Sequence, residues 1–131
     1  MWLSATAQMG LRAVVYLSRQ DPDRLIPVEE IADAVDLPRN YLSKTLGKLR
    51  RAGVLVSSRG PTGGFRLARP ETEITIAEVV APFTPPGNRR CILGRENCGD
   101  GNPCPAHHQW SQVASRIEQY VEETTIAKLK A

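Results

Sequence analysis

The chain has 131 residues, about the length of one domain, and its 41% hydrophobic and 24% charged residues are typical of a globular protein. No run approaches the ~20 consecutive apolar residues of a membrane-spanning helix, which excludes an integral membrane protein. The first twenty residues lack a basic segment ahead of an apolar one, so we expect no signal peptide and a cytoplasmic protein. Three cysteines cannot all pair within one chain, and in a reducing compartment thiols more often serve as metal ligands or redox groups.

Basic residues are concentrated in one stretch of the chain. Residues 37–69 hold eight Arg and Lys and no Asp or Glu, whereas the rest holds nine basic and all 14 acidic residues. The net charge of +3 therefore conceals a strongly basic segment. Such a segment predicts a polyanionic partner, and a solvated basic face without a partner is the alternative.

Apolar residues at helical spacing predict three helices in the first half of the chain. The first covers residues 5–19 with Ser4 as its N-cap, and the second begins at Pro27 and ends near Asp36. A third helix follows directly from Pro38 and can be capped by Gly53. Its apolar stripe consists of Tyr41, Leu42, Thr45, Leu46 and Leu49. Two helices joined by such a short turn are typical of a helix-turn-helix.

The second half of the chain predicts a hairpin, a short helix, a loop and a long helix. The β-prone runs 54–56 and 65–67 flank a turn-rich stretch and predict the hairpin. A short helix is expected over residues 74–83, and residues 87–103 form a loop. The last helix is expected to begin at Cys104 and to continue to Leu129. Its apolar stripe of Trp110, Ile117 and Val121 predicts a surface that pairs two chains.

The order of these elements is that of a winged helix-turn-helix. The predicted fold is therefore mostly α with a small β-hairpin wing, followed by a long C-terminal dimerisation helix. We expect a DNA-binding domain over residues 1–83, a cysteine-bearing metal or cluster loop over 84–104 and the dimerisation helix over 105–131. A helical bundle with an incidental hairpin is the alternative.

The third helix and the hairpin tip supply the candidate DNA contacts. With its leucines buried, the helix presents short polar groups for base edges and cations for phosphates in a major groove. The glycines beside Arg59 let the hairpin approach the duplex, so this guanidinium can enter a narrow minor groove. The candidate residues are Arg39, Asn40, Ser43, Lys44, Lys48 and Arg51 on the helix, and Arg59 and Thr62 on the hairpin.

The three cysteines Cys91, Cys98 and Cys104 lie within 14 residues and suggest a metal site. Thiolates favour zinc, copper(I) or iron–sulfur clusters, and His107 lies three residues after Cys104 on the same helical face. These residue types leave a Cys3His zinc site and an iron–sulfur cluster equally open. Unconnected thiols, or one disulfide and a spare thiol, are the alternatives. A pocket and oxyanion donors for Cys/His catalysis are not indicated, so we expect no enzyme.

Several motifs resemble the IscR, NsrR and CymR group of bacterial winged-helix regulators. They are the segment leading into Gly10-Leu11-Arg12-Ala13, the stretches Tyr41-Leu42 and Arg51-Ala52-Gly53, and the hairpin signature at residues 59–67, and the resemblance covers nearly the whole chain. It implies a homodimer that binds a palindromic operator and an iron–sulfur cluster that modulates DNA affinity. Cys91, Cys98 and Cys104 then match the cluster thiolates, His107 the histidine of the IscR-like two-iron site, and Arg59 the wing arginine.

Two positions depart from the pattern of this group. Gln8 stands where the nitric-oxide-sensing members have an acidic ligand, and Ser43 stands where the IscR-like members have a base-reading glutamate. We therefore expect a DNA-binding transcriptional regulator whose cluster, two-iron rather than four-iron, senses redox state, nitric oxide or iron–sulfur supply. The alternatives are a zinc-stabilised regulator without a redox role and a small iron–sulfur carrier. No membrane partner is expected.

Overall fold

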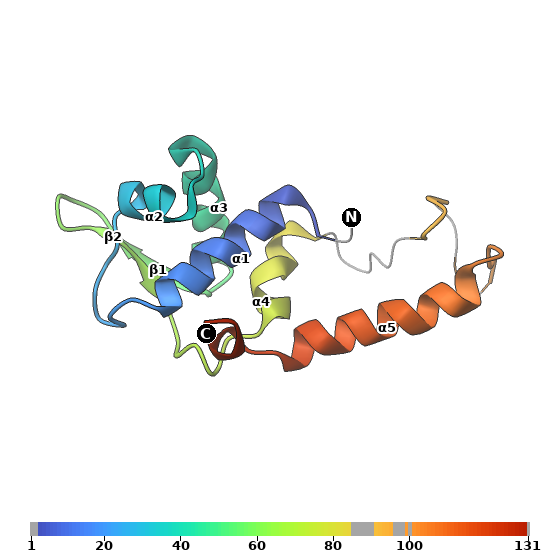
Figure 1. Cartoon of the computed structure of the whole chain (residues 1–131). Coiled ribbons are helices and arrows are strands. Elements are labelled where there is room, and N and C mark those ends of the chain that lie inside the picture. The colour runs from blue at the N-terminus through green and yellow to red at the C-terminus, as the bar shows by residue number, and fades with distance from the viewer. Residues whose placement is uncertain (1–2, 85–90, 96–98, 100, 131) are drawn as a thin grey trace.

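The computed structural model describes residues 3–84, 91–95, 99 and 101–130. Five α-helices and a two-stranded antiparallel hairpin make up its main elements, and in Figure 1 the long helix α5 extends as an arm away from the others. The elements are α1 (Ala5–Ser18), α2 (Val28–Val35), α3 (Arg39–Arg51), β1 (Leu55–Ser58), β2 (Gly64–Leu67), α4 (Ile76–Val80), the 3-10 turn η1 (Ala81–Phe83), α5 (His107–Glu123) and the 3-10 turn η2 (Ile126–Leu129). The expectation of a mostly α fold with a hairpin wing is confirmed.

Local signals in the sequence set most helix ends. The Ser4 hydroxyl accepts a hydrogen bond of 3.1 Å from the Ala7 N–H and so caps α1 as predicted. Asp36 ends α2 in the left-handed conformation, with φ 54° and ψ 55°, and Pro38 is the N-cap of α3. Thr75 and Glu78 form a reciprocal capping box at the start of α4.

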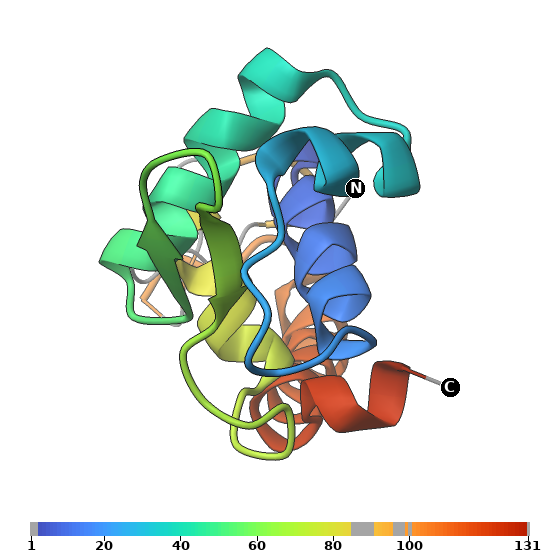
Figure 2. The same cartoon turned by 90° about the vertical axis from the view of Figure 1, so that its left-hand side faces the viewer.

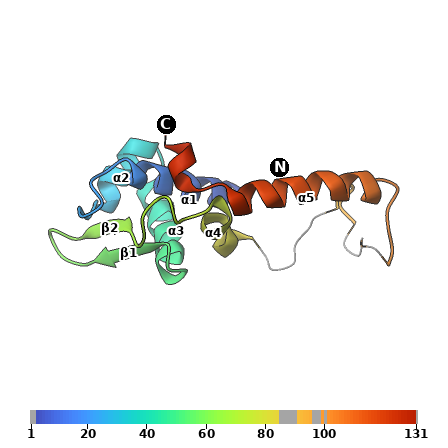
Figure 3. The same cartoon turned by 90° about the horizontal axis from the view of Figure 1, so that it is seen from below.

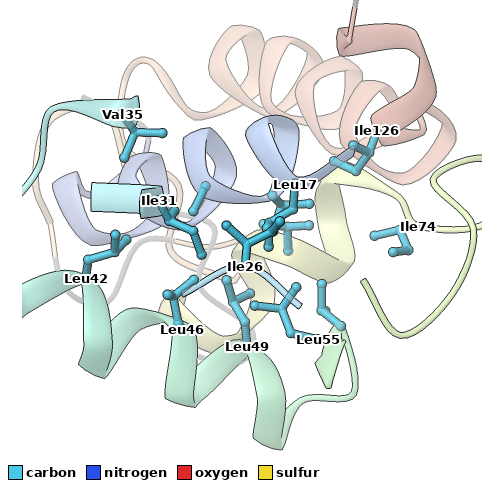
Figure 4. Packing of buried hydrophobic residues seen from close by; sticks show 14 of the residues in the cluster. Leu17, Ile26, Ile31, Val35, Leu42, Leu46, Leu49, Leu55, Ile74 and Ile126 are labelled. Carbon is cyan, nitrogen blue, oxygen red and sulfur yellow. The ribbon is translucent and has the colours of Figure 1, made fainter. Parts of the chain in front are cut away.

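One hydrophobic core joins the first three helices to the hairpin and to the end of the chain. Figure 4 shows its side chains pointing toward one another from α1, α2, α3 and β1, with Ile126 reaching in from η2. The labelled members are Leu17, Ile26, Ile31, Val35, Leu42, Leu46, Leu49, Leu55, Ile74 and Ile126. This core holds α3 and the hairpin in a fixed relation, because both contribute side chains to it.

The hairpin is joined to the segment that leads into α2, and Figure 2 shows the two beside each other. Ile26 and Phe65 exchange two backbone hydrogen bonds of 2.8 Å. Gly64 makes this approach possible: its φ is 155°, and a Cβ there would lie 2.3 Å from the Ile26 carbonyl oxygen. The close approach of the Ile26 backbone therefore explains why the hairpin signature has a glycine at position 64.

The last helix differs from the prediction at both ends. It begins at His107 rather than Cys104 and ends at Glu123 rather than Leu129. After α5 the backbone is extended, because the Ile76 N–H donates to the Thr124 carbonyl at 2.9 Å and the Ile126 N–H donates to the Ile74 carbonyl at 2.8 Å. These contacts, which helix periodicity does not reveal, turn the chain back to the core.

Tyr41 also differs from its prediction as a member of the apolar stripe of α3. Its side chain is 64% exposed, whereas Leu42, Leu46 and Leu49 are fully buried. Tyr41 lies about 100° from Leu42 around the helix axis, on the flank of the face that the three leucines bury. Within the described part of the chain, no helix is both long and apolar enough to cross a membrane.

Candidate nucleic-acid interface and cysteine site

Helix α3 has one face in the core and one face in solvent. Leu42, Thr45, Leu46 and Leu49 are buried, and the six candidate contacts on the helix, Arg39, Asn40, Ser43, Lys44, Lys48 and Arg51, are exposed. Apart from Tyr41, the predicted division of the helix into a core face and a solvent face is confirmed. The role of each exposed residue in DNA contact stays a prediction.

Arg39 has a protein partner that the sequence did not reveal. Its guanidinium lies 2.5 Å from a carboxylate oxygen of Glu29, in the first turn of α2. Both side chains are more than half exposed, so water screens the pair and its contribution to stability is small. The pair nevertheless means that Arg39 must exchange Glu29 for a phosphate if it contacts DNA.

The hairpin places its two candidate residues at an exposed tip. Arg59 and Thr62 lie in the turn between β1 and β2 and are exposed. The strand β1 packs beside α3, so the tip and the exposed face of α3 belong to the same module. This is the arrangement in which a helix enters one groove and a wing reaches an adjacent one.

Tyr41 is a candidate contact that sequence reasoning missed. It lies in the first turn of α3 next to Asn40, and its ring is mostly exposed. A tyrosine hydroxyl can donate to a phosphate oxygen, and the N-terminal residues of a recognition helix are those that reach base edges. The signal was present in the sequence, because Tyr41 lies on the flank of the stripe that the three leucines of α3 form.

The first helix of the helix-turn-helix is fixed to α1 by an ionic network. Arg24 donates two hydrogen bonds, of 3.0 and 2.7 Å, to the Glu30 carboxylate, and the Tyr16 hydroxyl donates to it at 3.3 Å. The hydrogen bond from Arg24 lowers the pKa of Glu30. Burial, followed by the nearby Glu30 charge, raises the pKa of Tyr16. Glu30 is therefore ionised at neutral pH, and it links α2 to α1.

Two of the three cysteines approach each other closely. The Sγ atoms of Cys91 and Cys104 are 3.4 Å apart, and Cys104 is only 5% exposed. A disulfide would require about 2.0 Å, whereas two thiolates on one tetrahedral metal at ~2.3 Å would lie ~3.8 Å apart. The Leu93 N–H also donates to the Cys91 sulfur at 3.4 Å, a bond that stabilises a thiolate. The two thiols are therefore not joined by a disulfide in this structure, and their separation is compatible with ligation of one metal.

Cys104 comes three residues before the start of α5 at His107, and Figures 1 and 3 show from two directions that this end of α5 is the far end of the arm. The His107 N–H donates to the Cys104 carbonyl at 3.0 Å, and the His107 Nε2 lies 3.4 Å from the Ser111 hydroxyl. Among the residues that the structure describes, no three potential ligands converge. Cys98 lies outside the described residues, so the complete ligand set stays a prediction.

Comparison with known proteins decides the family. Residues 3–131 match the Rrf2 family model, described as an iron-dependent transcriptional regulator. The chain belongs to the Rrf2 family. It is therefore a transcriptional regulator of the DNA-binding, winged-helix type, which the order of elements and the exposed basic helix predicted.

Relatives within the Rrf2 family match almost the whole chain. An HTH-type transcriptional regulator of Aquifex aeolicus is 37% identical over 132 residues, which cover 98% of this chain and 91% of the relative. IscR of Vibrio atlanticus is 27% identical over 129 residues, which cover 98% and 75%. The crystal structure of CymR, the global cysteine regulator of B. subtilis, shares the fold with a TM-score of 0.81 at 21% identity and covers 99% of this chain and 96% of that one.

Proposed function

We propose that this Rrf2 protein is a cytoplasmic, homodimeric regulator whose affinity for a palindromic duplex is set by an iron–sulfur cluster bound at Cys91, Cys98 and Cys104. The observation that carries the proposal is the pair of thiols 3.4 Å apart in a chain that also presents an exposed basic helix. The similarity of this chain to IscR, one of its relatives, supports the same function.

The donor set suits a soft metal centre. Cys91 and Cys104 supply two thiolates, Leu93 donates an N–H to one of them, and the burial of Cys104 limits the access of water. We place Cys98 as the third thiolate and His107 as the fourth ligand. A bound cluster supplies one-electron redox chemistry at a potential that a histidine ligand raises. Rotation of the His107 ring away from Ser111 would make its nitrogen available.

Helix α5 supplies the surface for pairing. Val121, which belonged to the predicted pairing stripe, is instead buried in this chain's own core with Ala7, Ile76 and Val80. Ala114 is also buried, and the exposed apolar residues of α5 are Val113 and Tyr120, at 50% and 56%. Val113 and Tyr120 are seven residues apart and so lie on one side of the helix. The exposure of these two apolar side chains is explained if this side of α5 packs against a second copy of the protein. A dyad there would present two α3 helices to successive major grooves, ~34–36 Å apart.

The nature of the metal is tested by anaerobic purification followed by iron, sulfide and zinc assays and a visible spectrum. We expect iron and sulfide with visible absorbance, which each of the variants Cys91→Ala, Cys98→Ala and Cys104→Ala should lose. Colourless protein with stoichiometric zinc would instead establish the zinc-stabilised regulator.

His107 and the adjacent His108 provide a matched pair of variants for the fourth ligand. His108 is exposed on α5, so His108→Ala should keep the spectrum of the wild type. His107→Ala should shift the spectrum or make the cluster labile. Full iron and sulfide content with an unchanged spectrum in His107→Ala would remove this residue from the ligand set.

A regulator is distinguished from an iron–sulfur carrier by DNA binding with and without the metal. A regulator changes its affinity for a selected duplex when the metal is removed, and the affinity of both forms falls steeply with salt. Equal affinity of the loaded and stripped forms would contradict control by the cluster.

A further inference from the structure

Lys48 on α3 has an aromatic partner outside the helix-turn-helix. Its ammonium nitrogen lies 5.8 Å from the centroid of the Phe83 ring, which is within the range of a cation–π interaction. In the part of the chain that the structure describes, Lys48 has no carboxylate partner and neither Lys44 nor Arg51 has a ring contact of this kind. The ring is therefore the group within interaction range of this ammonium in the described part of the chain.

The position of the Phe83 ring is itself fixed by packing. Phe83 is the last residue of η1 and is half-buried against both hydrophobic clusters of the protein. Its Cε2 atom would lie 2.9 Å from a Cβ built on Gly10, and Leu49 Cδ1 would lie 3.5 Å from the same point. The ring thus fills a space between α1 and α3 that exists because residue 10 has no side chain.

An aromatic partner suits a lysine that must bind phosphate. A carboxylate partner would neutralise the charge and compete with DNA, as Glu29 does for Arg39. A ring face leaves the full positive charge and leaves the N–H groups that point away from it available to an anion. Holding the long side chain in place before binding also reduces the conformational entropy lost on contact.

We propose that Phe83 is a positioning residue for DNA binding, which holds Lys48 ready to contact a backbone phosphate. Lys44, Lys48 and Arg51 follow one another at spacings of four and three and share one side of α3, so they can track the same strand. Lys48 is the member of this row whose placement depends on a residue outside α3.

The same contact gives the cysteine segment a connection to α3, a step that rests on the proposed function. Phe83 and the following Thr84 end the described part of the winged module, and Cys91 comes eight residues after Phe83. A change in this segment on metal binding would act on the chain that follows Thr84. A displacement of the ring would then alter the placement of Lys48 and, through it, the affinity for DNA.

The positioning role is tested by a double-mutant cycle on metal-stripped, reduced full-length protein, with a short duplex of mixed sequence as probe. Phe83→Leu keeps an apolar side chain but removes the ring, and should weaken binding by about two- to fivefold. Phe83→Tyr should restore the affinity. In a Lys48→Met background Phe83→Leu should have no further effect, whereas in a Lys44→Met background it should keep its full effect. An equal loss in the Lys48→Met background would show that the ring acts only through the fold and would overturn the proposal.

The connection to the cysteine segment is tested by the ratio of affinities of metal-loaded and metal-stripped protein. If the wild type shows a ratio different from one, Phe83→Leu should bring it closer to one, and an unchanged ratio would overturn the connection. If the wild type shows no difference, the proposed control by the metal fails together with the connection. The double-mutant cycle still decides the positioning role in that case, because it uses no metal.

Discussion

Arg39, the first residue of α3, forms an ion pair of 2.5 Å with Glu29 in the first turn of α2. The pair joins the two helices of the helix-turn-helix across their short turn. The pair also engages the Arg39 guanidinium, a cation of the basic segment that would otherwise be available to bind DNA. If Arg39 contacts a DNA phosphate as predicted, the carboxylate of Glu29 competes with that phosphate for the guanidinium.

Glu29→Gln should release Arg39 and increase the affinity for DNA. One additional phosphate contact per protomer steepens the slope of log affinity against log salt by about 0.9. The matched control is Asp33→Asn, which removes the same charge from an exposed position of α2 without an ion pair to Arg39. Titrations over a range of salt concentrations measure both slopes, and equal slopes for the two variants would contradict the competition.

Gly10→Ala should destabilise the protein, whereas Gly47→Ala should stabilise it. Both glycines are inside helices, where alanine gains about 0.5–1 kcal/mol. A Cβ on Gly10 meets the Phe83 ring at 2.9 Å, and the overpacking costs about 1–3 kcal/mol, while a Cβ on Gly47 meets nothing within 4 Å. Urea unfolding measures the difference between them. A stability gain in both variants would show that the ring yields to the new methyl group without cost.

The Glu30 network should give stability that depends on pH. The lowered pKa of Glu30 means that its stabilisation is fully present above the unfolded pKa of about 4.3 and is lost as the pH falls through the folded value. Glu30→Gln should therefore lower the thermal unfolding midpoint at pH 7, and the difference from the wild type should vanish in acid. In an Arg24→Gln background the same substitution should change the midpoint little. An undiminished effect in that background would assign the stabilisation to something other than this pair.

Val113→Glu should weaken pairing through α5. The substitution places a charge on the exposed apolar side of the arm, where burial of an unpaired carboxylate costs several kcal/mol. Glu122→Lys changes an exposed residue on the opposite side of the helix and should leave assembly unchanged. Sedimentation equilibrium at micromolar concentration distinguishes the two. A monomeric wild type, or a Val113→Glu dimer of undiminished affinity, would place the interface elsewhere.

Arg59→Ala should reduce discrimination between duplexes as well as affinity. A wing arginine in a narrow minor groove reads the width of the groove, so its loss should cost about 1 kcal/mol more on a duplex selected from a random pool than on mixed sequence. Lys48→Ala should instead weaken both about equally, because a phosphate contact carries no sequence information. Equal losses on the two duplexes for Arg59→Ala would remove its role in readout.

Much of the winged module could be predicted because its signals are local. Helical periodicity, the caps at Ser4 and Thr75 and the proline before α3 are each written within a few residues of the element they define. The buried face of α3 followed from the same periodicity. Tyr41 was misassigned because a stripe of five residues is wider than the face that the core covers.

The features that could not be predicted join segments far apart in the sequence. The backbone pairing of Thr75 with Thr125, which ends the arm, and the contact of Lys48 with Phe83 leave no pattern in either segment alone. At the cysteine site the spacing indicated a metal but not the geometry. The approach of Cys91 to Cys104 across 13 residues depends on a loop whose glycines allow many paths.

Ile126 is fully buried in the core of the winged module, although the long helix α5 separates it in the sequence from the other members of that core. During synthesis, α1, the helix-turn-helix, the hairpin and the whole of α5 leave the ribosome before this side chain does. The nascent chain therefore carries its complete basic segment and all three cysteines while its core lacks a member. Closing that core requires contacts between segments that are far apart in the sequence, which form slowly. The core of the winged module is thus completed only after α5 and Ile126 have been synthesised.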